Sequence, residues 1–399
     1  MYNNLAVLAV FAFLFSAIAG RVERSVVTGP MVYIFFGLLA GPVGIGILDM
    51  DVETVELRVI ADLTLALVLF IDASNADLKV LRQHSQIPVR MLLIGLPLCI
   101  ALGAALGMVV FPEISLFEVC VLATMLAATD AALGKGVVSN EAVPDRVRQG
   151  LNAESGLNDG MAVPVLFVFL ALAAGSGGEE GSGQLALQLV LEEIGIGIAV
   201  AVVLVTGAVQ LMKVARDLNW FNDIWRQIPV VALALACFAT AQSLHGSGFI
   251  ACFVGGLLFG YFAGERTHHL VLAAEGIGEL LAMFTWVVFG AVFMGVYLAE
   301  VTWQIAIYAL LSLTVIRMVP VVIALTGTGE PFENKLFLAW FGPRGLASIV
   351  FMVIVTSYNL PAESVFIPTV VLTITLCIVA HGLTANPWAN RLARKSQQG

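Results

Sequence analysis

The chain has 399 residues, of which 60% are hydrophobic and 12% are charged, and its mean hydropathy is +0.97. A soluble domain of this size does not need so much apolar surface, so the composition excludes a soluble protein and indicates a polytopic membrane protein with the lipid bilayer as its partner. The formal net charge of −9 says little about other partners, and no nucleic-acid ligand is expected. The five cysteines are irregularly spaced in apolar segments, which predicts neither disulfides nor a zinc site.

Apolar runs bounded by glycine, proline and charged residues predict thirteen membrane-spanning helices. The first run has no basic residue before it, so we interpret it as a span rather than a signal peptide. No hydrophilic stretch is long enough for a soluble domain. We therefore expect one transmembrane domain over residues 1–399, with 386–399 as a short cytoplasmic tail. The predicted spans lie near 4–20, 27–48, 55–75, 86–110, 116–138, 147–174, 186–212, 226–244, 247–264, 270–297, 301–325, 334–357 and 363–385.

The loops between these spans differ in charge. If the N-terminus lies outside, all but three of the 19 Lys and Arg residues fall in cytoplasmic loops or helix ends, whereas the opposite loops are nearly all acidic. This asymmetry is the positive-inside pattern, and it predicts an external N-terminus and a cytoplasmic C-terminus. The three exceptions are Arg58, Arg317 and Arg344. Arg58 is expected to reach the interface, whereas the other two need an acidic or carbonyl partner within the bundle.

Two carboxylates, an amide and a hydroxyl interrupt the predicted sixth span. Because a helix turns about 100° per residue, Glu154 lies one turn from Asn158, and Ser155 lies one turn from Asp159. The four side chains therefore share one sector of the helix. An ionised side chain in the membrane costs roughly 2.5–3.5 kcal/mol on insertion scales, so this cluster is the first candidate for a functional site.

The predicted fifth and twelfth spans carry two further interruptions. Thr129 and Asp130 place a second aspartate beside small residues in the fifth span, and two aspartates on adjacent helices, each near a hydroxyl, favour a cation site over a simple pair with arginine. The twelfth span contains Gly342-Pro343-Arg344-Gly345, which predicts a helix break lining a cavity. The two spans are seven apart, as expected if spans 1–6 (about 4–174) and 8–13 (about 226–385) are inverted repeats joined by span 7 (about 186–212).

Two other groups of titratable residues lie near predicted span ends. Asp72 ends an apolar run in the third span, where it either reaches the ion pathway or faces cytoplasmic water. Asp62, in the same span, is expected to pair helices or to line a funnel. The histidines are expected to have ordinary loop roles: His84, His245, His268, His269 and His381.

Taken together, Ala128-Thr129-Asp130 and the motif from Glu154 to Gly160 resemble the paired motifs of monovalent cation–proton antiporters, most closely the NhaP-type sodium/proton exchangers. Arg317 to Pro320 and Gly342 to Gly345 look like the two arginine signatures of that family, so the resemblance spans nearly the whole chain. Ala131 departs from the pattern, because the family usually has proline after Thr-Asp. The resemblance implies a homodimer of thirteen-helix subunits in which the broken spans 5 and 12 cross at the site.

The resemblance also implies a role for each site residue. Asp159 would bind the cation or the proton, and Asp130, Ser155 and the Thr129 backbone would help to coordinate the cation. Glu154 would pair with Arg317 and hold Asn158, whose position before Asp159 marks electroneutral exchangers. Asp72 is the nearest match to the third-span acid of the family, which is often glutamate. Arg344 is grouped with the Glu154–Arg317 ion pair.

We therefore expect a secondary antiporter of the prokaryotic inner membrane, with no cofactor, that exchanges Na⁺, and also Li⁺, for H⁺ and serves pH homeostasis. Asp159 would bind one of the two ions at a time, and the neutral, occupied site would cross the membrane barrier more easily than the empty, charged site. The nearest alternative is a K⁺/H⁺ antiporter with the same fold, since only the cage size differs. More remote alternatives are a channel or symporter, and an intramembrane aspartyl protease using Asp130 and Asp159. Apart from that last case, the chain is not expected to be an enzyme.

Overall fold

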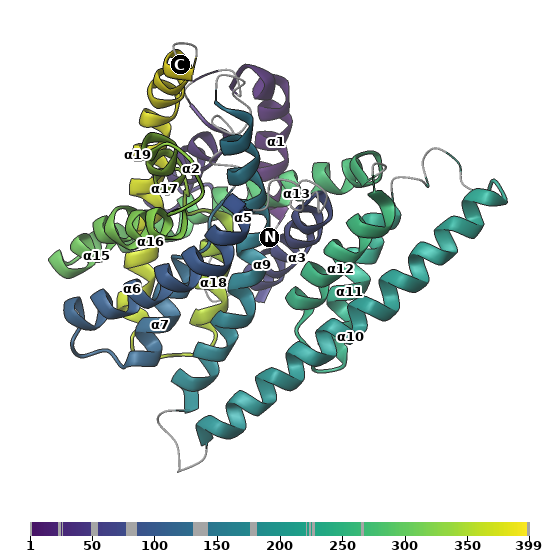
Figure 1. Ribbon diagram of the computed structural model, residues 1–399, viewed down its shortest axis with the longest axis horizontal. Helices are drawn as coiled ribbons and strands as arrows, with labels where there is room; N and C mark the ends of the chain where they lie inside the picture. The colour runs from purple at the N-terminus through teal and green to yellow at the C-terminus, as the bar shows by residue number, and fades with distance from the viewer. Residues whose placement is uncertain are drawn as a thin grey trace.

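Every regular element that the structure describes is a helix (Figure 1). The computed structural model describes residues 2–22, 25, 27–48, 55–76, 86–130, 143–175, 182–220, 222, 225, 228–264 and 267–396. Several sequence predictions lie outside these ranges. They include the second half of the predicted fifth span, with Ala131, and some of the basic residues that predict orientation, namely Arg24, Lys79, Arg82, Lys135, Arg226 and Arg266.

The first half of the chain contains a series of helices that precede the long helix α10. They are α1 (Tyr2–Val22), α2 (Gly29–Ala40), α3 (Val55–Asn75), the continuous run of α5 (Gln86–Arg90), η1 (Met91–Gly95) and α6 (Leu96–Val110), then α7 (Leu116–Met125) and α9 (Asp145–Gly175). The long helix α10 (Ser182–Asp217) runs along one side of the molecule next to α11 and α12 (Figure 1).

The second half begins with α11 (Pro229–Ser243) and α12 (Gly248–Ala263). Helix α13 (Thr267–Val288) continues through η3 (Phe289–Met294), α14 (Gly295–Tyr297) and η4 (Leu298–Glu300). The last elements are α15 (Trp303–Leu313), α16 (Val315–Ala324), α17 (Phe332–Trp340), α18 (Leu346–Thr356) and α19 (Glu363–Ser396).

Seven helical segments in the described part of the chain are long and apolar enough to cross a membrane. They are Tyr2–Val22, Gln86–Val110, Asp145–Gly175, Leu187–Asp217, Leu270–Glu300, Trp303–Ala324 and Glu363–Leu392. Shorter apolar helices of 10–17 residues accompany them: α2, α7, α11, α12 and α18. The protein is therefore an all-helical integral membrane protein.

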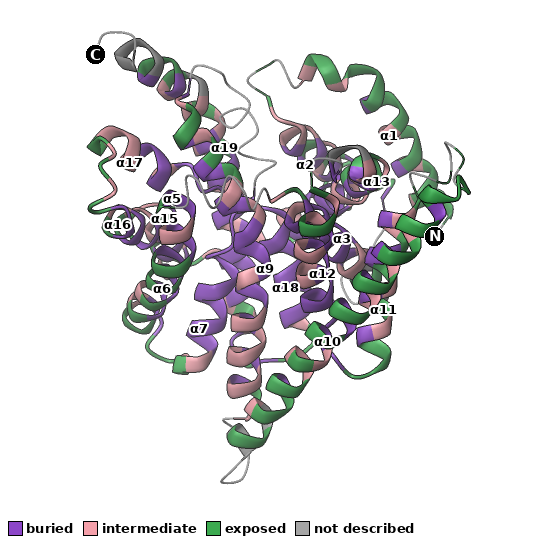
Figure 2. Cartoon of the chain, turned by 45° about the vertical axis from the view of Figure 1, so that its right-hand side comes forward, coloured by how far each residue is buried: buried purple, intermediate pink, exposed green. Residues whose placement is uncertain are grey.

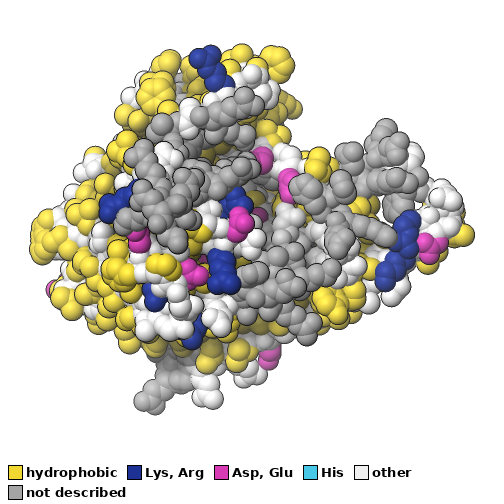
Figure 3. Space-filling model, turned by 45° about the horizontal axis from the view of Figure 1, so that its top comes forward, with side chains coloured by type: hydrophobic (Ala, Val, Ile, Leu, Met, Phe, Trp, Pro, Cys, Tyr) yellow, Lys and Arg dark blue, Asp and Glu magenta, His cyan; other side chains and the backbone are white. Residues whose placement is uncertain are grey.

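The outer surface is apolar, as a lipid-facing surface must be. Phe13 of α1 is 75% exposed and Val203 of α10 is 69% exposed. Many residues of α1 and α10 are exposed, whereas α18 at the centre is almost entirely buried and α9 is mainly buried or intermediate (Figure 2). Hydrophobic side chains cover much of the described surface on the face drawn in Figure 3. So large an apolar surface is unfavourable in contact with water, so it is explained by contact with lipid.

Helices α3 and α12 pack closely because two glycines of α12 face the α3 backbone. A Cβ atom added at Gly256 would lie 2.3 Å from the Phe70 carbonyl oxygen, and one at Gly260 would lie 2.4 Å from that of Ser74. The two glycines are four residues apart and so share one face of α12. Small residues at such spacing let helix backbones approach each other. The contact fixes the part of α3 that carries Asp72.

Gly256→Ala is therefore expected to destabilise the protein by about 1–3 kcal/mol, because the new methyl group has no space beside Phe70. Thermal unfolding in detergent, followed by tryptophan fluorescence, measures the change. Gly207→Ala in α10 is the matched control, since a Cβ there would meet nothing within 4 Å. Equal unfolding temperatures for the two variants would contradict the close packing of α3 and α12.

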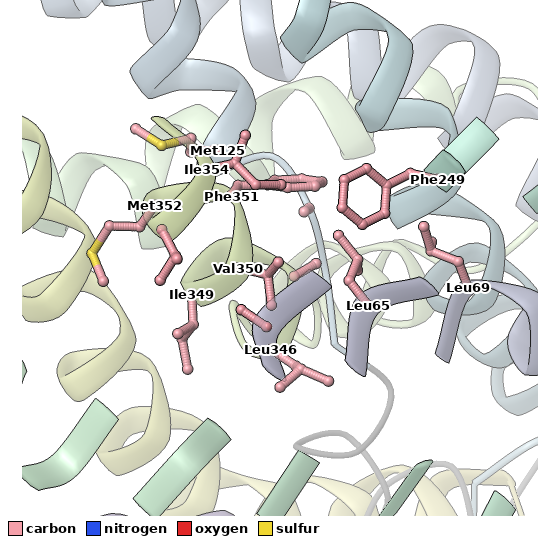
Figure 4. Close-up of a cluster of buried hydrophobic side chains, with 14 of the residues drawn as sticks. Leu65, Leu69, Met125, Phe249, Leu346, Ile349, Val350, Phe351, Met352 and Ile354 are labelled. Carbon is pink, nitrogen blue, oxygen red and sulfur yellow. The ribbon is translucent and has the colours of Figure 1, made fainter. Parts of the chain in front are cut away.

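The centre of the molecule is formed around α18. Leu346, Val350 and Phe351 of this helix are buried together with Leu65 and Leu69 of α3. Phe249 of α12 and Met125 at the end of α7 complete the cluster, which Figure 4 shows. This apolar packing holds α18 between α3 and α7, so it positions the breaks at the ends of α7 and α18.

The helix boundaries differ from the predicted spans in three places. In the predicted second span, 27–48, helix α2 ends at Ala40. The predicted eleventh span is divided at Thr314 (φ −108°, ψ −93°) into α15 and α16. The helix of the predicted last span, 363–385, is also longer than predicted, because α19 continues to Ser396. Its last turns stay helical because Ala389 and Leu392 are buried, and because Arg391 Nε lies 3.3 Å from Glu333 Oε1 of α17.

Candidate ion-binding site

Two non-helical segments meet at the centre of the membrane domain. Helix α7 ends at Met125, and the residues that follow, up to Asp130, leave the helix. Helices α17 and α18 are separated by residues 341–345, which form the predicted break. The Asp130 backbone N–H donates to the Pro343 carbonyl oxygen at 2.7 Å, and this bond joins the two segments.

The Asp130 side chain also caps the following helix. Its Oδ2 accepts a hydrogen bond of 2.8 Å from the backbone N–H of Leu346, the first residue of α18. A carboxylate is favoured there because the first N–H groups of a helix have no partner within the helix and carry partial positive charge. A Cβ atom at Gly345 would lie 2.0 Å from Asp130 Oδ2, so glycine is required for this approach.

The C-terminal end of α7 also receives a hydrogen bond in this region. Ser348 Oγ of α18 donates to the Met125 carbonyl oxygen at 2.8 Å. Met125 is the last residue of α7, and its carbonyl has no continuing helix to accept from. The hydroxyl therefore satisfies a buried backbone group, and α18 supports both the end of α7 and the segment that follows it.

Helix α9 presents Glu154 and Asn158 to this junction. Asn158 Nδ2 lies 2.9 Å from Glu154 Oε1, 3.2 Å from Thr129 Oγ1 and 3.4 Å from the Ala127 carbonyl oxygen. The amide thus joins α9 to the segment after α7. Glu154 and Asn158 lie one turn apart on one face, as the helical period predicts.

Glu154 also forms a buried ion pair. Arg317 Nη1 of α16 donates to Glu154 Oε1 at 2.8 Å, and the two side chains are 2% and 1% exposed. A charge buried so deeply needs a partner, which explains why Arg317 can occupy the middle of a predicted span. The pair fixes α16 against α9, and Glu154 in turn fixes Asn158.

Asp159 lies next to this network but is bonded differently. The residue is 6% exposed. The Thr129 backbone N–H hydrogen-bonds its carboxylate, whereas its buried Oδ1 has no hydrogen-bond partner within the described structure. The negative charges of Asp130, Asp72 and Glu154 act on it. A buried carboxylate with a free oxygen among other acids is stabilised by a bound cation or by a proton.

Ser155 and Asp72 complete the surroundings of Asp159. Ser155 is 5% exposed and precedes Asp159 by one turn of α9. Asp72 approaches from α3: a Cβ atom at Gly156 would lie 3.8 Å from the Asp72 Cβ and 3.7 Å from its carbonyl oxygen. Asp72 is only partly buried and is subject to the charges of Asp130, Glu275 and Glu279. Asp72 therefore lies beside the turn of α9 that contains Gly156.

Arg344 does not take part in the predicted ion pair. Its Nη1 donates to the Gly342 carbonyl oxygen at 2.6 Å and its Nη2 to that of Ser312 at 3.3 Å. The reason is that the breaks after α15 and α17 leave carbonyl oxygens without helical partners. Among the described residues, the hydrogen bonds of this guanidinium therefore go to carbonyl groups, while Arg317 pairs with Glu154.

Asp62 lies outside the cluster. Its Oδ2 is 3.8 Å from Arg58 Nε, one turn away on α3, and the Arg58 side chain is 51% exposed. Sequence reasoning missed two backbone partners of the site, the Pro343 carbonyl and the Leu346 N–H. It placed the Thr129 backbone in the site, but as a ligand of the cation and not as a donor to Asp159. Every residue has these groups, so no residue type marks them. The only signal in the sequence that these backbone groups lack helical partners is the pair of steps around the break, Gly342-Pro343 and Gly345-Leu346.

An all-helical membrane domain with ionisable side chains at the meeting point of two helix breaks is the architecture of an ion transporter. The family model described as "Sodium/hydrogen exchanger, transmembrane" matches residues 8–391, and the chain belongs to this family. The predicted resemblance to NhaP-type cation–proton antiporters is thereby confirmed.

Individual relatives agree with this assignment. The K⁺/H⁺ antiporter NhaP of Alkalimonas amylolytica is 22% identical over 98% of this chain, and the match covers 67% of that protein, so the chain spans about two thirds of its length. A Na⁺/H⁺ antiporter of Saccharomyces cerevisiae is 32% identical over 41% of the chain and 17% of the relative. The sodium proton antiporter MjNhaP1 of Methanocaldococcus jannaschii has the same fold, with a TM-score of 0.77, 20% identity and 98% of each chain covered.

Proposed function

We propose that the protein is a secondary antiporter that exchanges Na⁺, and also Li⁺, for H⁺, and that the two ions compete for Asp159. The observation that carries the proposal is the buried Asp159 Oδ1, which lacks a hydrogen-bond partner in the described structure while its carboxylate lies among other acids. Such a group is unfavourable when empty and is neutralised equally well by a monovalent cation or a proton.

The same group enforces exchange. An empty Asp159 carries a charge that opposes passage through a low-dielectric barrier, whereas an occupied site is neutral and passes. The carrier therefore moves only with an ion bound, and it returns only with an ion bound. Asp130, Ser155 and the Thr129 backbone complete the oxygen ligands of the cation, and Asp72 contributes from α3.

One cation exchanged for one proton at a single carboxylate moves no net charge. Asn158 does not ionise, because it is an amide held by Glu154, Thr129 and the Ala127 carbonyl. Exchange is therefore electroneutral. An inward proton gradient then expels sodium and acidifies the cytoplasm, which is a contribution to pH homeostasis.

The membrane topology belongs to the same proposal. The chain crosses a prokaryotic inner membrane thirteen times, with the N-terminus outside and the C-terminus in the cytoplasm, as a single transmembrane domain that forms a homodimer. Spans 1–6 and 8–13 are inverted repeats around a linker span in α10. The seven long apolar segments, the shorter α2, α7, α11, α12 and α18, and the 21-residue helix α3 support this count, as does the unequal distribution of basic residues.

A K⁺/H⁺ antiporter is the second candidate. It is favoured by a specific observation, since the relative from Alkalimonas amylolytica and the NhaP2 proteins of Shewanella species are described as K⁺/H⁺ antiporters. Carboxylate, hydroxyl and carbonyl oxygens bind both ions, and only the size of the cage separates them. The relatives are described as antiporters, which leaves no support for a protease that uses Asp130 and Asp159.

The proposed function is tested by adding each alkali cation in turn to proteoliposomes. Purified protein in proteoliposomes with an imposed inward-acidic pH gradient should restore the fluorescence of a pH-sensitive dye when Na⁺ or Li⁺ is added. A response to K⁺ alone would establish the second candidate. No response to any alkali ion, with protein shown to be inserted, would contradict antiport.

Electroneutrality is tested separately, with Na⁺ as the transported ion. A potential imposed with valinomycin and K⁺ is expected to leave the initial rate and the final pH gradient unchanged, because the exchange moves no charge. A potential that shifts the final gradient would instead show that protons and cations are exchanged in unequal numbers.

A further inference from the structure

One face of α19 holds both ends of the helix break that contacts Asp130. Cys377, His381 and Thr384 lie at helical spacing on this face. Cys377 Sγ accepts a hydrogen bond of 3.0 Å from the Arg344 backbone N–H. Thr384 Oγ1 accepts one of 2.9 Å from Trp340 Nε1. His381 lies between them and is 4% exposed, which contradicts the loop role predicted for it.

The two ring nitrogens of His381 face two carbonyl oxygens. Nε2 lies 2.8 Å from the carbonyl oxygen of Trp340, the last residue of α17, and Nδ1 lies 2.9 Å from that of Cys377. Nδ1 also lies 3.1 Å from Cys377 Sγ. A carbonyl oxygen can only accept a hydrogen bond, so both bonds form only if both ring nitrogens carry a proton.

A neutral imidazole carries one proton and cannot satisfy both carbonyls. Whichever nitrogen loses its proton then presents a lone pair to an oxygen lone pair at less than 3 Å. The Trp340 and Phe341 rings pack against the imidazole, with centroids 5.1 and 5.9 Å from it. Both carbonyl contacts are hydrogen bonds only in the imidazolium form.

The charges around the ring are few within the described structure. On α19 itself the titratable neighbour is the Cys377 thiol, which also receives the Arg344 backbone N–H. Helix α17 contributes the uncharged Trp340 and the adjoining Phe341, and α2 contributes Met31 beside Gly382. The Arg391–Glu333 pair joins the same two helices further along α19. A proton on His381 is thus held chiefly by the two carbonyl groups.

The His381 contact leads directly to the ion-binding site. Trp340 ends α17, and the residues that follow supply the Pro343 carbonyl and the Leu346 N–H that bind Asp130. Fixing the Trp340 end and the Arg344 amide on α19 therefore fixes the position of both groups that hold Asp130.

We propose that His381 is a positioning residue that carries two ring protons and clamps the break between α17 and α18, and that loss of one proton to water loosens the clamp and the hold on Asp130. This goes beyond the proposed function, and only its effect on transport rests on that function. The clamp itself can be tested on the protein without any transported ion.

Ring protonation is measured on detergent-solubilised protein labelled with ¹⁵N-histidine. The His381 signals are assigned by their loss in His381→Gln. At about pH 6 both ring nitrogens are expected at the shifts of protonated nitrogens, with a single titration step at higher pH. A Nδ1 that is unprotonated at every pH, with the Cys377 thiol donating to it, would overturn the proposal.

Amide hydrogen exchange measures the clamp itself. After correction for intrinsic rates, the protection of the amides of Gly342, Arg344 and Leu346 is expected to fall about tenfold across the His381 titration, as for the loss of one hydrogen bond to a charged group. His381→Gln should show no step. Thr384→Val, which removes the Trp340 Nε1 partner without removing a titratable group, should lower protection equally at all pH values and keep the step.

The outcomes are distinct. A wild-type protein without the step, or a step that survives in His381→Gln, would overturn the clamp. If His381→Gln does not fold, the wild-type spectra and Thr384→Val still decide the question. A wild-type protein that shows the step but no alkali-ion exchange in proteoliposomes would contradict the proposed function while leaving the clamp established.

Discussion

Asp159→Asn should reduce cation-dependent proton flux in proteoliposomes to the level of liposomes without protein. The amide has nearly the same shape as the carboxylate, but it neither binds a proton in the required range nor offers a negative charge to a cation. In the proposed mechanism both half-reactions use this one group, so neither survives. Dequenching of a pH-sensitive dye after addition of Na⁺, Li⁺ or K⁺ measures the flux.

The fold should survive this substitution. Asp159 carries an unsatisfied buried oxygen among the charges of Asp130, Asp72 and Glu154, so the neutral amide removes repulsion, and the unfolding temperature should stay equal or rise. Asp62→Asn is the matched control, since it removes a carboxylate from α3 that pairs with Arg58 outside the cluster. Near-normal flux is expected for the control. Persistent exchange in Asp159→Asn would refute the central role of this residue.

Breaking the buried pair between Glu154 and Arg317 should have the largest effect on stability. Glu154→Gln leaves the Arg317 charge buried without a counter-charge, and Arg317→Gln does the same to Glu154. Each side chain is at most 2% exposed, so solvent cannot replace the lost partner. Each single substitution is therefore expected to cost about 3–5 kcal/mol, which thermal or denaturant unfolding in detergent detects.

The double variant Glu154→Gln with Arg317→Gln separates the pair from its members. Two neutral amides in contact leave no buried charge, so the double variant should be more stable than either single variant. Flux should also be reduced in Glu154→Gln and in the double variant, because Asn158 there loses the carboxylate acceptor that lies 2.9 Å away. Additive losses of stability in the double variant would show that the two residues are not coupled.

Much of the site could be predicted because burying ionisable side chains in a membrane costs free energy, so such side chains stand out in apolar spans. The helical period places Glu154, Ser155, Asn158 and Asp159 in one sector, and Gly342 to Gly345 marks the break where it is found. These features follow from local rules. The contact of Asp130 with Leu346, and not with an arginine, does not follow from local rules. It depends on how α7 and α18 pack.

Other features have no local signal. Thr314 interrupts the predicted eleventh span although neither glycine nor proline is present at that position. The end of α19 remains helical because its apolar residues pack on α17, which a count of basic residues in a presumed tail does not reveal. For Arg344 the sequence predicts an acidic or a carbonyl partner, and only the packing of the two breaks decides for carbonyl oxygens.

Helix α9 is bonded strongly to the helices on one side and only weakly to α3 on the other, so a sliding motion is easiest between α9 and α3 at Gly156. On one side, hydrogen bonds and an ion pair tie α9 to the segment after α7, to α16 and, through Asp130, to the start of α18. On the other side, α3 leaves room at Gly156, where even an added Cβ atom would reach only van der Waals distance of Asp72. Sliding α9 past α3 sacrifices little, whereas separating it from α7 or α16 breaks buried polar bonds. A displacement that carries Asp159 past Asp72 therefore moves the remaining ligands with it as one rigid body.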